Sequence, residues 1–379
     1  MLNGKAWLPV YSQMPLTAVS GHGSWLVDDR GNQWLDAYGG HAVASTGHCH
    51  PRVVQAIREQ AATLIFYSTA IPHRLREELA DRIAERCPGD LSRVFFCNSG
   101  AEANENALGL ARKVTGRQKI VSVEGGWHGR TAACLAVTDG AKYEAGAIRA
   151  GLPLSTKVPF NDVAAMGAAV DGTVAGVIVE PVQGLTGARD CSADFLQAAR
   201  RACDKAGAAL IFDEIQCGVG RLGKFTAAEW YGVTPDIITM AKGLASGVPI
   251  GAMVATGALT SDIHIGDLGS TFGGGPLASA AGLATLAVID DESLLENVTT
   301  VGTYLKAGLG KLKAPVQGHG LLLGVRSARP AADVQRSLFG HKVLTGTASD
   351  PAILRLMPPL TFSIGEADLL LDALQRVLP

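Results

Sequence analysis

Short apolar runs alternate with amphipathic, helix-length segments through the middle of the chain, and this alternation limits the possible fold more than any other feature. We expect helices over 101–114 and around 195–205, and strands over 92–97, 119–123, 174–179, 208–212, 236–240 and 251–255. Strands separated by helices form a largely parallel sheet that helices cover on both faces. The pattern therefore predicts an α/β fold.

The two ends of the chain follow a different pattern. Segments 24–28 and 33–38 are typical of short antiparallel strands around a turn at 29–32, and residues 364–377 form an amphipathic helical pattern after a long helix at 277–289. We therefore expect a large domain with a mostly parallel sheet over 46–280. A smaller α+β domain would combine residues 1–45 with residues 281–379.

Composition excludes several classes of protein. The 379 residues are 47% hydrophobic and 18% charged, which indicates a sizeable core rather than a disordered chain. A net charge of −2 gives no electrostatic reason to expect nucleic acid or an anionic membrane as a partner. No apolar stretch approaches the roughly 18 residues that span a bilayer.

The cysteines favour a reduced compartment. The 7 cysteines are scattered, odd in number and without a C-x-x-C pair, which argues against a disulfide framework. Residues 1–5 lack the charged-then-apolar pattern of a signal peptide. We expect a cytoplasmic enzyme with small-molecule substrates.

Three polar signals fall at the carboxyl ends of predicted strands, where open α/β sheets bind ligands. The first is Asn98–Glu105, which joins a strand to a helix. The Ser99 hydroxyl and the free amides of Gly100 and Ala101 would form an anion-binding cradle for a phosphate. A simple helix N-cap explains the same residues equally well.

The other two signals are an acid and a lysine. Asp213 ends a buried apolar strand and could be a metal ligand, a general base, a partner for a cationic ring nitrogen or a structural cap. Lys242 ends the strand at 236–240, where burial requires either a lowered pKa or imine formation. Many such lysines merely extend their ammonium group to solvent.

Together the three signals fit one cofactor, pyridoxal 5'-phosphate (PLP). A phosphate cradle, an acid for the pyridinium nitrogen and an imine-forming lysine are the parts that a PLP site requires. The acid would keep the ring nitrogen protonated, and the lysine would move the proton of the substrate Cα.

Two further motifs suggest a dinucleotide site and a metal site, but the residues around them fit these sites poorly. Gly218–Gly223 satisfies the G-x-G-x-x-G pattern of a dinucleotide site, but the intervening Asp-Glu-Ile-Gln segment and the residues that follow make a poor fingerprint helix. His48-Cys49-His50 resembles a metal cluster, yet adjacent residues do not easily face one tetrahedral ion. We predict no metal site and interpret this segment as a turn before Pro51.

The chain resembles the class III (subgroup II) PLP-dependent aminotransferases, specifically the acetylornithine aminotransferase branch. The matching blocks cover nearly the whole length, namely Leu35–Pro51, Phe95–Asn106, His128–Thr131, Glu180–Gly184, Phe212–Gln216, Thr234–Gly243, Gly269–Gly274 and Leu354–Leu360. The resemblance implies a fold-type I PLP enzyme that acts as a homodimer with shared active sites.

The resemblance also implies roles around the cofactor. Lys242 would form the Schiff base, and Asp213 would pair with the pyridinium nitrogen. The other cofactor contacts would come from Ser99, Gly100, Ala101, Trp127, Gln216 and, from the second subunit, Thr271. Trp127 stands where the family usually has phenylalanine, a change that keeps a flat face for ring stacking.

Two arginines would bind substrate carboxylates. Arg130 resembles the residue that binds the carboxylate remote from the reacting amine, and Arg355 the residue that binds the α-carboxylate of glutamate or 2-oxoglutarate. Ser270 would lie near the substrate. Each arginine could instead form a surface salt bridge.

One position departs from the family. Many relatives carry a glutamate that masks the arginine matching Arg355, and here that position is Leu185. Leucine cannot neutralise a guanidinium, so another group or water must balance Arg355, or the donor differs.

We therefore expect an N-acylornithine:2-oxoglutarate aminotransferase of arginine biosynthesis that works by ping-pong transamination. The segments 38–43 and 344–346 resemble a branch for which N-succinylornithine is the proposed donor in place of N2-acetylornithine. The alternatives are another ω-aminotransferase, acting on ornithine, 4-aminobutyrate or a diamine, and a non-catalytic PLP-binding regulatory subunit.

Overall fold

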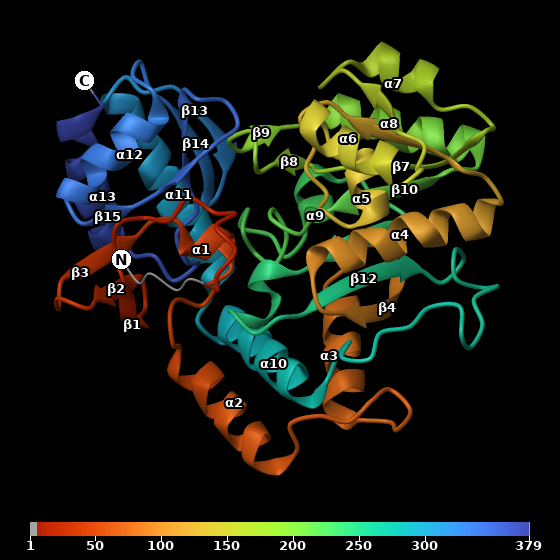
Figure 1. Cartoon of the computed structure of the whole chain (residues 1–379), viewed down its shortest axis with the longest axis horizontal. Coiled ribbons are helices and arrows are strands. Elements are labelled where there is room, and N and C mark those ends of the chain that lie inside the picture. The colour runs from red at the N-terminus through yellow and green to blue at the C-terminus, as the bar shows by residue number, and fades with distance from the viewer. Residues whose placement is uncertain (1–5, 379) are drawn as a thin grey trace.

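The centre of the molecule is a seven-stranded sheet. A computed structural model describes residues 6–378, and Figure 1 shows the sheet within it. The strand order is β4 (Leu91–Cys97), β12 (Gly251–Thr256), β11 (Ile237–Met240), β10 (Ala209–Asp213), β7 (Val174–Val179), β5 (Lys119–Val123) and β6 (Thr156–Val158). Strand β12 runs antiparallel to both neighbours, whereas β11, β10, β7, β5 and β6 are parallel. The predicted α/β class is confirmed.

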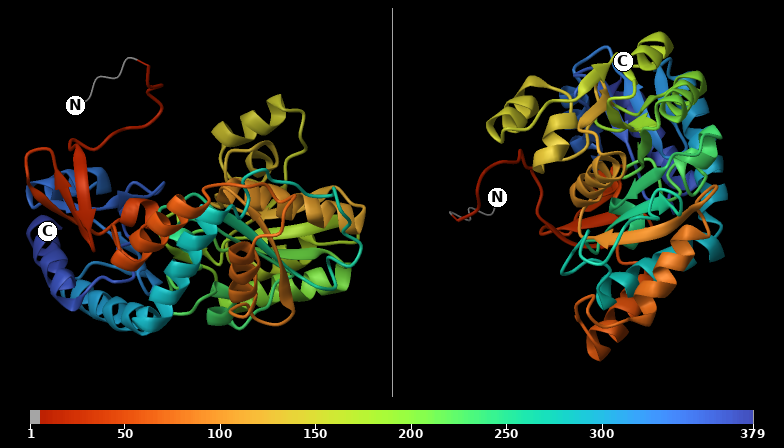
Figure 2. Two further views of the ribbon diagram at one scale, coloured as in Figure 1. Left: turned by 90° about the horizontal axis from the view of Figure 1, so that it is seen from below. Right: turned by 90° about the vertical axis from the view of Figure 1, so that its right-hand side faces the viewer.

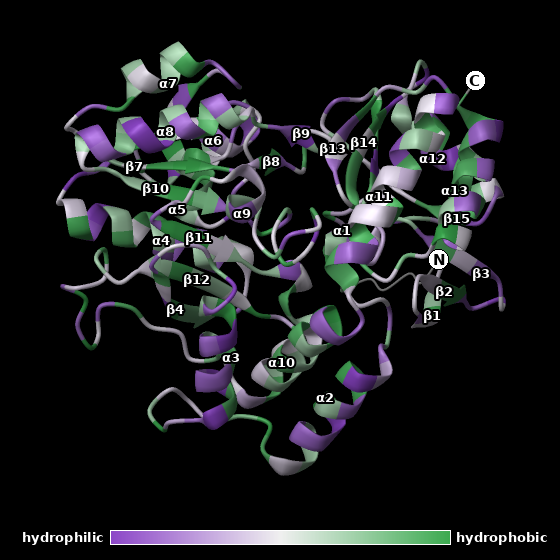
Figure 3. Cartoon of the chain, turned by 180° about the vertical axis from the view of Figure 1, so that it is seen from behind, coloured by the Kyte–Doolittle hydropathy of each residue, from purple (hydrophilic) through white to green (hydrophobic). Residues whose placement is uncertain are grey.

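The inner strands are apolar because helices cover both faces of the sheet. All residues of β7 and β10 are buried, as expected for continuous apolar runs inside a parallel sheet. Figure 3 shows these strands in hydrophobic colours, while the covering helices carry hydrophilic outer faces. On these faces lie α4 (Gly100–Thr115), α5 (Ala132–Val137), α7 (Val163–Ala169) and α8 (Ala193–Ala206).

Helix α8 illustrates how local sequence sets the ends of a helix. The Ser192 hydroxyl accepts a hydrogen bond from the Phe195 amide at 3.2 Å, which caps the first turn. The helix ends at Gly207, whose φ of 64° is the left-handed conformation that glycine adopts without strain. Between these ends, Phe195, Ala199 and Cys203 repeat at four-residue spacing and are buried.

A second group of helices lies below the sheet in Figure 1. Helix α10 (Pro276–Asp291) packs against α2 (Pro51–Thr63) and α3 (Arg74–Ala84), as Figure 2 also shows. Helix α10 extends the helix predicted over 277–289 by a residue or two at each end. The sequence pattern had not predicted the helices at 51–63 and 74–84.

Two four-stranded sheets lie apart from the central one, and the first of them combines both ends of the described chain. The first joins β1 (Ala18–His22), β2 (Trp25–Asp28) and β3 (Gln33–Asp36) to β15 (Val343–Leu344), which pairs parallel to β3. The second contains β13 (Val316–His319), β14 (Leu322–Arg326), β17 (Ile353–Leu356) and β16 (Gly346–Thr347). Helices α11 (Leu294–Lys311), α12 (Ala331–Gly340) and α13 (Ile364–Val377) pack beside these strands.

The predicted hairpin near the N-terminus is present. Strands β2 and β3 pair antiparallel, and the Asp28 carboxylate accepts hydrogen bonds from the amides of Arg30 at 3.0 Å and Asn32 at 2.8 Å. This Asx-type turn explains why a short polar segment reverses the chain here.

Three sequence features bear on where the protein is located: its N-terminal residues, the apolarity of its helices and its cysteines. Residues 1–5, in which the sequence shows no signal-peptide pattern, lie outside the described residues. Within residues 6–378, every helix is too short or too polar to cross a membrane. All seven cysteines are free thiols.

A buried acid links the end of β10 to helix α9 (Ala227–Tyr231). The Glu214 carboxylate is fully buried and accepts hydrogen bonds from the amides of Ala227 at 2.6 Å and Ala228 at 2.8 Å. Burial raises the pKa of Glu214 to about 8, although both hydrogen bonds oppose this effect.

This raised pKa predicts a pH-dependent stability. The folded protein keeps a proton on Glu214 that the unfolded chain loses near its ordinary pKa of 4.5. The resulting stability is complete below that pKa and is lost as the pH rises toward 8, by up to about 1.4 kcal/mol per pH unit. We expect the unfolding free energy of Glu214→Gln, measured by urea titration, to fall less between about pH 6 and about pH 8 than that of the wild-type protein. Glu296→Gln, at an exposed position of α11, is the control, and equal slopes in the two variants would contradict the prediction.

Candidate active site

A cavity of about 550 Å³ opens at the edge of the sheet where β10 and β11 end. This is a typical volume for a small-molecule site. Most of the residues predicted from the sequence line it, namely Ser99, Gly100, Ala101, Trp127, Arg130, Asp213, Gln216, Lys242 and Arg355. Ser270 and Thr271 do not.

The first turn of α4 forms one wall. The Ser99 hydroxyl accepts a hydrogen bond from the Glu102 amide at 3.2 Å, so Ser99 is indeed an N-cap. Its hydroxyl proton and the amides of Gly100 and Ala101 have no partner within the helix and remain available to an anion. A Cβ on Gly100 would lie 2.7 Å from the Ile215 side chain, so the close approach here requires glycine.

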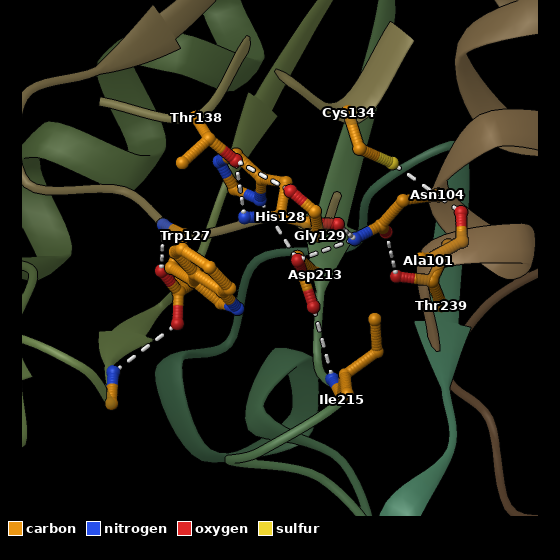
Figure 4. A network of polar contacts seen from close by, with 12 residues as sticks. Ala101, Asn104, Trp127, His128, Gly129, Cys134, Thr138, Asp213, Ile215 and Thr239 are labelled. Atoms are coloured by element: carbon orange, nitrogen blue, oxygen red, sulfur yellow. Dashed lines mark hydrogen bonds and ion pairs between the residues drawn. The ribbon is translucent and has the colours of Figure 1, made fainter. Parts of the chain in front are cut away.

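Asp213 forms the floor of the cavity and is held from several elements (Figure 4). Its Oδ2 accepts hydrogen bonds from Asn104 Nδ2 at 2.7 Å and His128 Nδ1 at 2.8 Å, and its Oδ1 accepts from the Ile215 amide at 3.1 Å. The Thr239 hydroxyl donates to Asn104 Oδ1 at 2.7 Å, which fixes the orientation of that amide. The carboxylate is therefore fixed in position, with only 3% of the residue exposed.

Asn104, His128 and Thr239 had no assigned role in the sequence analysis. Asn104 and His128 lie inside sequence blocks that carry the family resemblance, and this was the only sign in the sequence that they belong to the site. Thr239 pairs with Asp213 in the register of β11 with β10, a contact that the sequence does not specify. Among residues 6–378, no three His, Cys, Asp or Glu side chains are placed to hold one metal ion.

Lys242 follows β11 and lines the same cavity as Asp213. Burial lowers the pKa of its ammonium group, although the negative charges of Asp213 and Glu180 oppose this effect. Within the described residues its Nζ forms no hydrogen bond and no ion pair, so it does not act as a surface charge. Its φ of 46° is left-handed, a conformation that costs a non-glycine residue roughly 1–2 kcal/mol. Such strain is typical of functional positions.

Glu180 is a further acid that the sequence analysis did not assign to the site. Its carboxylate accepts hydrogen bonds from the amides of Trp127 at 2.7 Å and Gly184 at 3.1 Å. Burial and the neighbouring charge of Asp213 raise its pKa to about 7. Glu180 thus anchors the backbone of Trp127, whose ring forms another wall of the cavity.

Arg130 is the more accessible of the two predicted arginines. Its guanidinium carbon lies 5.2 Å from the centre of the Trp127 ring, a cation–π arrangement. The Trp127 ring in turn meets the Tyr143 ring edge-on at 4.8 Å. Arg130 forms no ion pair within residues 6–378, so the salt-bridge interpretation fails and its fork of donors is free.

Arg355 lies on β17 and is only 5% exposed. Its Nε donates to the Thr347 carbonyl at 2.7 Å, its Nη1 to the Gly184 carbonyl at 3.2 Å and its Nη2 to the Tyr38 hydroxyl at 2.9 Å. None of its partners in the described chain is a carboxylate. The group that contacts Arg355 in place of the family glutamate is therefore Tyr38, which the sequence analysis did not identify.

The remaining predicted residues differ in position. The Gln216 Oε1 atom is buried without a hydrogen-bond partner. The Ser270 hydroxyl accepts from Asn98 Nδ2 at 3.3 Å, just outside the cavity. Thr271 is exposed. The cavity of the single chain therefore does not include Ser270 or Thr271.

The two competing motifs take other roles. His48 Nε2 lies 2.8 Å from Asp36, and His50 Nε2 lies 3.0 Å from Glu292, so the two imidazoles bind different partners. Gly218–Gly223 forms turns and does not open a helix, as a dinucleotide fingerprint would require. Arg221 within this segment is buried and donates to the Pro358 carbonyl.

The lining residues fit PLP. The α4 amides can bind a phosphate, Asp213 can pair with a ring nitrogen, and Trp127 offers a flat face. Lys242 has a lowered pKa and no partner in the described residues, and Gln216 Oε1 is a buried acceptor that still needs a donor. These are the interactions that the phosphate, ring and aldehyde of that cofactor require.

Comparisons with known proteins agree with this geometry. The class-III aminotransferase family matches residues 8–378. An acetylornithine aminotransferase of Methanocaldococcus jannaschii is 40% identical over 99% of this chain and 96% of its own length. The crystal structure of an acetylornithine aminotransferase from Elizabethkingia anophelis superposes with a TM-score of 0.87 at 28% identity, covering 100% of this chain and 97% of that one. An ornithine aminotransferase of Toxoplasma gondii, solved with PLP partially occupying its active site, has a TM-score of 0.92 at 29% identity over 99% of this chain and 92% of that one.

The polar network around Asp213 predicts a large stability effect at Asn104. Asn104→Ala removes a donor to Asp213 and leaves the buried Thr239 hydroxyl without an acceptor, so we expect a loss of about 2–4 kcal/mol in unfolding free energy. Asn106→Ala is the matched control on the same helix, because Asn106 is partly exposed and donates only to the Glu102 carbonyl. Urea titration of both variants measures the difference, and similar losses would contradict a special role for the network.

Proposed function

Because the chain belongs to the class-III aminotransferase family, whose cofactor is pyridoxal 5'-phosphate, we propose that it transfers the δ-amino group of an N-acylornithine to 2-oxoglutarate. The acyl group would be acetyl or succinyl, and the reaction would serve arginine biosynthesis. One observation carries this proposal: a single cavity holds a lysine of lowered pKa together with two arginines that lack carboxylate partners in the described chain.

The cofactor would be held from three sides. Ser99, Gly100 and Ala101 would bind its phosphate, Asp213 its ring nitrogen and Trp127 its ring face, with Gln216 beside its phenolic oxygen. When bound, pyridoxal phosphate supplies an aldehyde that condenses with amines and a ring that accepts electrons from the adjacent carbon.

The protein groups then perform the proton transfers. Lys242 Nζ, whose pKa burial lowers, would take the proton from the donor's reacting carbon and return it one position away. Asp213, fixed by Asn104 and His128, would hold a proton at the ring nitrogen through the reaction. Closing the cavity against water would prevent loss of these protons to solvent.

The two arginines would orient both substrates in turn. Arg130 would bind the carboxylate remote from the reacting amine, which in both an N-acylornithine and glutamate lies at the far end of the molecule. Arg355 would bind the α-carboxylate of glutamate or 2-oxoglutarate, for which the acylornithine has no counterpart. Both are bidentate contacts that a lysine would not reproduce.

A homodimer would complete the site. Thr271 and Ser270 would contribute to the cavity of the partner subunit, which fits their exposed or peripheral position here. Beside them lies an exposed apolar surface, with Phe272 61% and Ile65 62% exposed and with the Phe66 and Phe272 rings 4.9 Å apart. Neighbouring exposed apolar side chains of this kind support a protein interface.

We place the enzyme in the cytoplasm and divide it into a large PLP-binding domain over 46–280 and a small domain from 1–45 and 281–379. The parallel pairing of β15 with β3 supports the joining of both ends in one unit. The rival activity is that of another ω-aminotransferase, since a solved neighbour is an ornithine aminotransferase. A non-catalytic PLP-binding subunit is less compatible with the partner-free Lys242.

Steady-state rates with 2-oxoglutarate test the proposed function. We expect kcat/KM for N2-acetylornithine or N-succinylornithine to exceed that for ornithine and for 4-aminobutyrate by about tenfold or more. Negligible activity with both acyl donors would reject the acylornithine proposal, and preference for a free diamine would favour the rival.

Replacing Lys242 tests its assignment. Lys242→Ala should lower kcat by about 10²–10⁴-fold or more, because the variant lacks the group that moves the proton. Lys224→Ala, at an exposed lysine paired with Glu229, should keep wild-type activity. The visible absorbance of the bound cofactor should bleach with glutamate in the wild-type protein and persist in Lys242→Ala, and an unchanged spectrum in both would support a non-catalytic subunit.

A further inference from the structure

Arg355 is a buried cation that has a neutral side chain as its partner. Two of its donors bind the carbonyls of Thr347 and Gly184, and the third binds the Tyr38 hydroxyl at 2.9 Å. No ion pair to Arg355 occurs within residues 6–378. A phenol satisfies the hydrogen-bonding capacity of a guanidinium without supplying a negative charge, and the Glu180 carboxylate acts on Arg355 only through space, so the site remains attractive to an anion.

The direction of each hydrogen bond around Tyr38 is fixed by chemistry. Arg355 can only donate, so the Tyr38 oxygen accepts from Nη2 and its single proton must go elsewhere. The available acceptor is His41 Nδ1, at 2.6 Å. His41 is therefore neutral with its proton on Nε2, in agreement with burial and the charges of Arg355 and Lys242, which lower the pKa of its imidazole.

The backbone that carries this pair is strained. Gly39, Gly40, His41 and Ala42 all have left-handed φ values, of 57°, 56°, 67° and 65°. Left-handed conformations are unfavourable for His41 and Ala42, which are not glycines, so the surrounding structure must impose them. The Asp36 carboxylate fixes the start of this segment by accepting hydrogen bonds from the amides of Tyr38 and Gly39, both at 2.9 Å.

A glycine on the neighbouring strand makes room for the phenol ring. A Cβ on Gly346 would lie 2.0 Å from Tyr38 Cε2, so no other residue fits there without moving the ring. Gly346 is also the residue opposite Arg355 in the pairing of β16 with β17. The left-handed segment 39–42, β16 and β17 therefore all meet at the contact between Tyr38 and Arg355.

The cavity reaches this contact from the substrate side. His41, Arg355 and Leu185 all line it together with Lys242, whereas Tyr38 lies behind them. A carboxylate that enters beside Lys242 can therefore compete with the Tyr38 hydroxyl for Arg355 Nη2. The exchange replaces a hydrogen bond from the guanidinium to a neutral phenol by one to a carboxylate, in which both partners are charged and which is therefore the stronger of the two.

We propose that Tyr38 and His41 form a neutral gate on Arg355 that sets the enzyme's substrate specificity. The proposal rests on the proposed function, in which one site receives two kinds of substrate. When the reacting carbon bears no carboxylate, Tyr38 satisfies Arg355 and His41 holds Tyr38 in place. When it bears one, as in glutamate or 2-oxoglutarate, the carboxylate displaces the phenol. Both residues are positioning residues that act through Arg355.

Single-turnover half-reactions of the holoenzyme test the gate. The probes are glutamate, which carries a carboxylate on the reacting carbon, and 5-aminopentanoate and N2-acetylornithine, which do not. Tyr38→Phe leaves Arg355 Nη2 unsatisfied only with the latter two, so their kcat/KM should fall by about tenfold while that of glutamate is unchanged or rises. A purely structural role would lower all three together, and that outcome, or an unchanged ratio, overturns the gate.

Binding of glutarate provides a second measurement that does not depend on turnover. Removing the competing hydroxyl should lower the Kd of this dicarboxylate several-fold in Tyr38→Phe, whereas a damaged site would bind it more weakly. His41→Asn should shift the ratio in the same direction, and asparagine tolerates the left-handed φ at this position. Tyr304→Phe is the control, because its hydroxyl bonds to Asp368 on the surface.

The two proposals can fail separately. Wild-type activity on the two acylornithines decides the proposed function, whereas the effect of Tyr38→Phe on glutamate against 5-aminopentanoate, and on glutarate, decides the gate. A shifted ratio and tighter glutarate binding with no acylornithine activity would keep the gate and reject the donor. If the wild-type protein acts on an acylornithine but Tyr38→Phe changes kcat/KM equally for all probes, the proposed function is kept and the gate is rejected.

Discussion

The hydrogen bonds to the Asp213 carboxylate organise the rest of the site. They join the end of β10 to α4 through Asn104, to the loop after β5 through His128 and, one step further, to β11 through Thr239. A buried carboxylate without such donors would cost several kcal/mol, so these elements are constrained to meet at one point. That point also fixes the end of β11, two residues before Lys242, and the start of α4, where the anion cradle lies.

The cofactor half of the site could be predicted because its signals are local. A strand that ends in a polar residue and leads into a helix places that residue at a known edge of a parallel sheet, whatever the rest of the chain does. Ser99 and Lys242 follow this rule, Asp213 ends its strand at the same edge but leads into turns, and the strands before all three are apolar enough to be recognised. The direction of a strand within the sheet is harder to predict. The apolar run of β12 does not indicate that this strand lies antiparallel between β11 and β4.

The substrate half depends on contacts that no local pattern specifies. Tyr38 and Arg355 are 317 positions apart and meet only because β15 pairs with β3 and because Gly346 leaves space for a ring. The sequence indicated that something must replace the missing glutamate opposite Arg355, but a tyrosine beside two glycines carries no sign of that role. The left-handed φ of His41 is equally hidden, since propensity alone disfavours it.

The two halves therefore differ in how completely their polar groups are satisfied. Asp213 is bound by several donors and has little freedom, which suits its proposed alignment with one cofactor through both half-reactions. In the described part of the chain Arg130 has no hydrogen-bond or ion-pair partner and Arg355 has a neutral one, so both arginines can still bind the carboxylates of substrates. A carboxylate partner for Arg355 within the chain would compete with every substrate carboxylate by charge, whereas a phenol competes only as a hydrogen-bond acceptor. The choice of partner at this one guanidinium thus adjusts the balance between two substrates without altering the reaction.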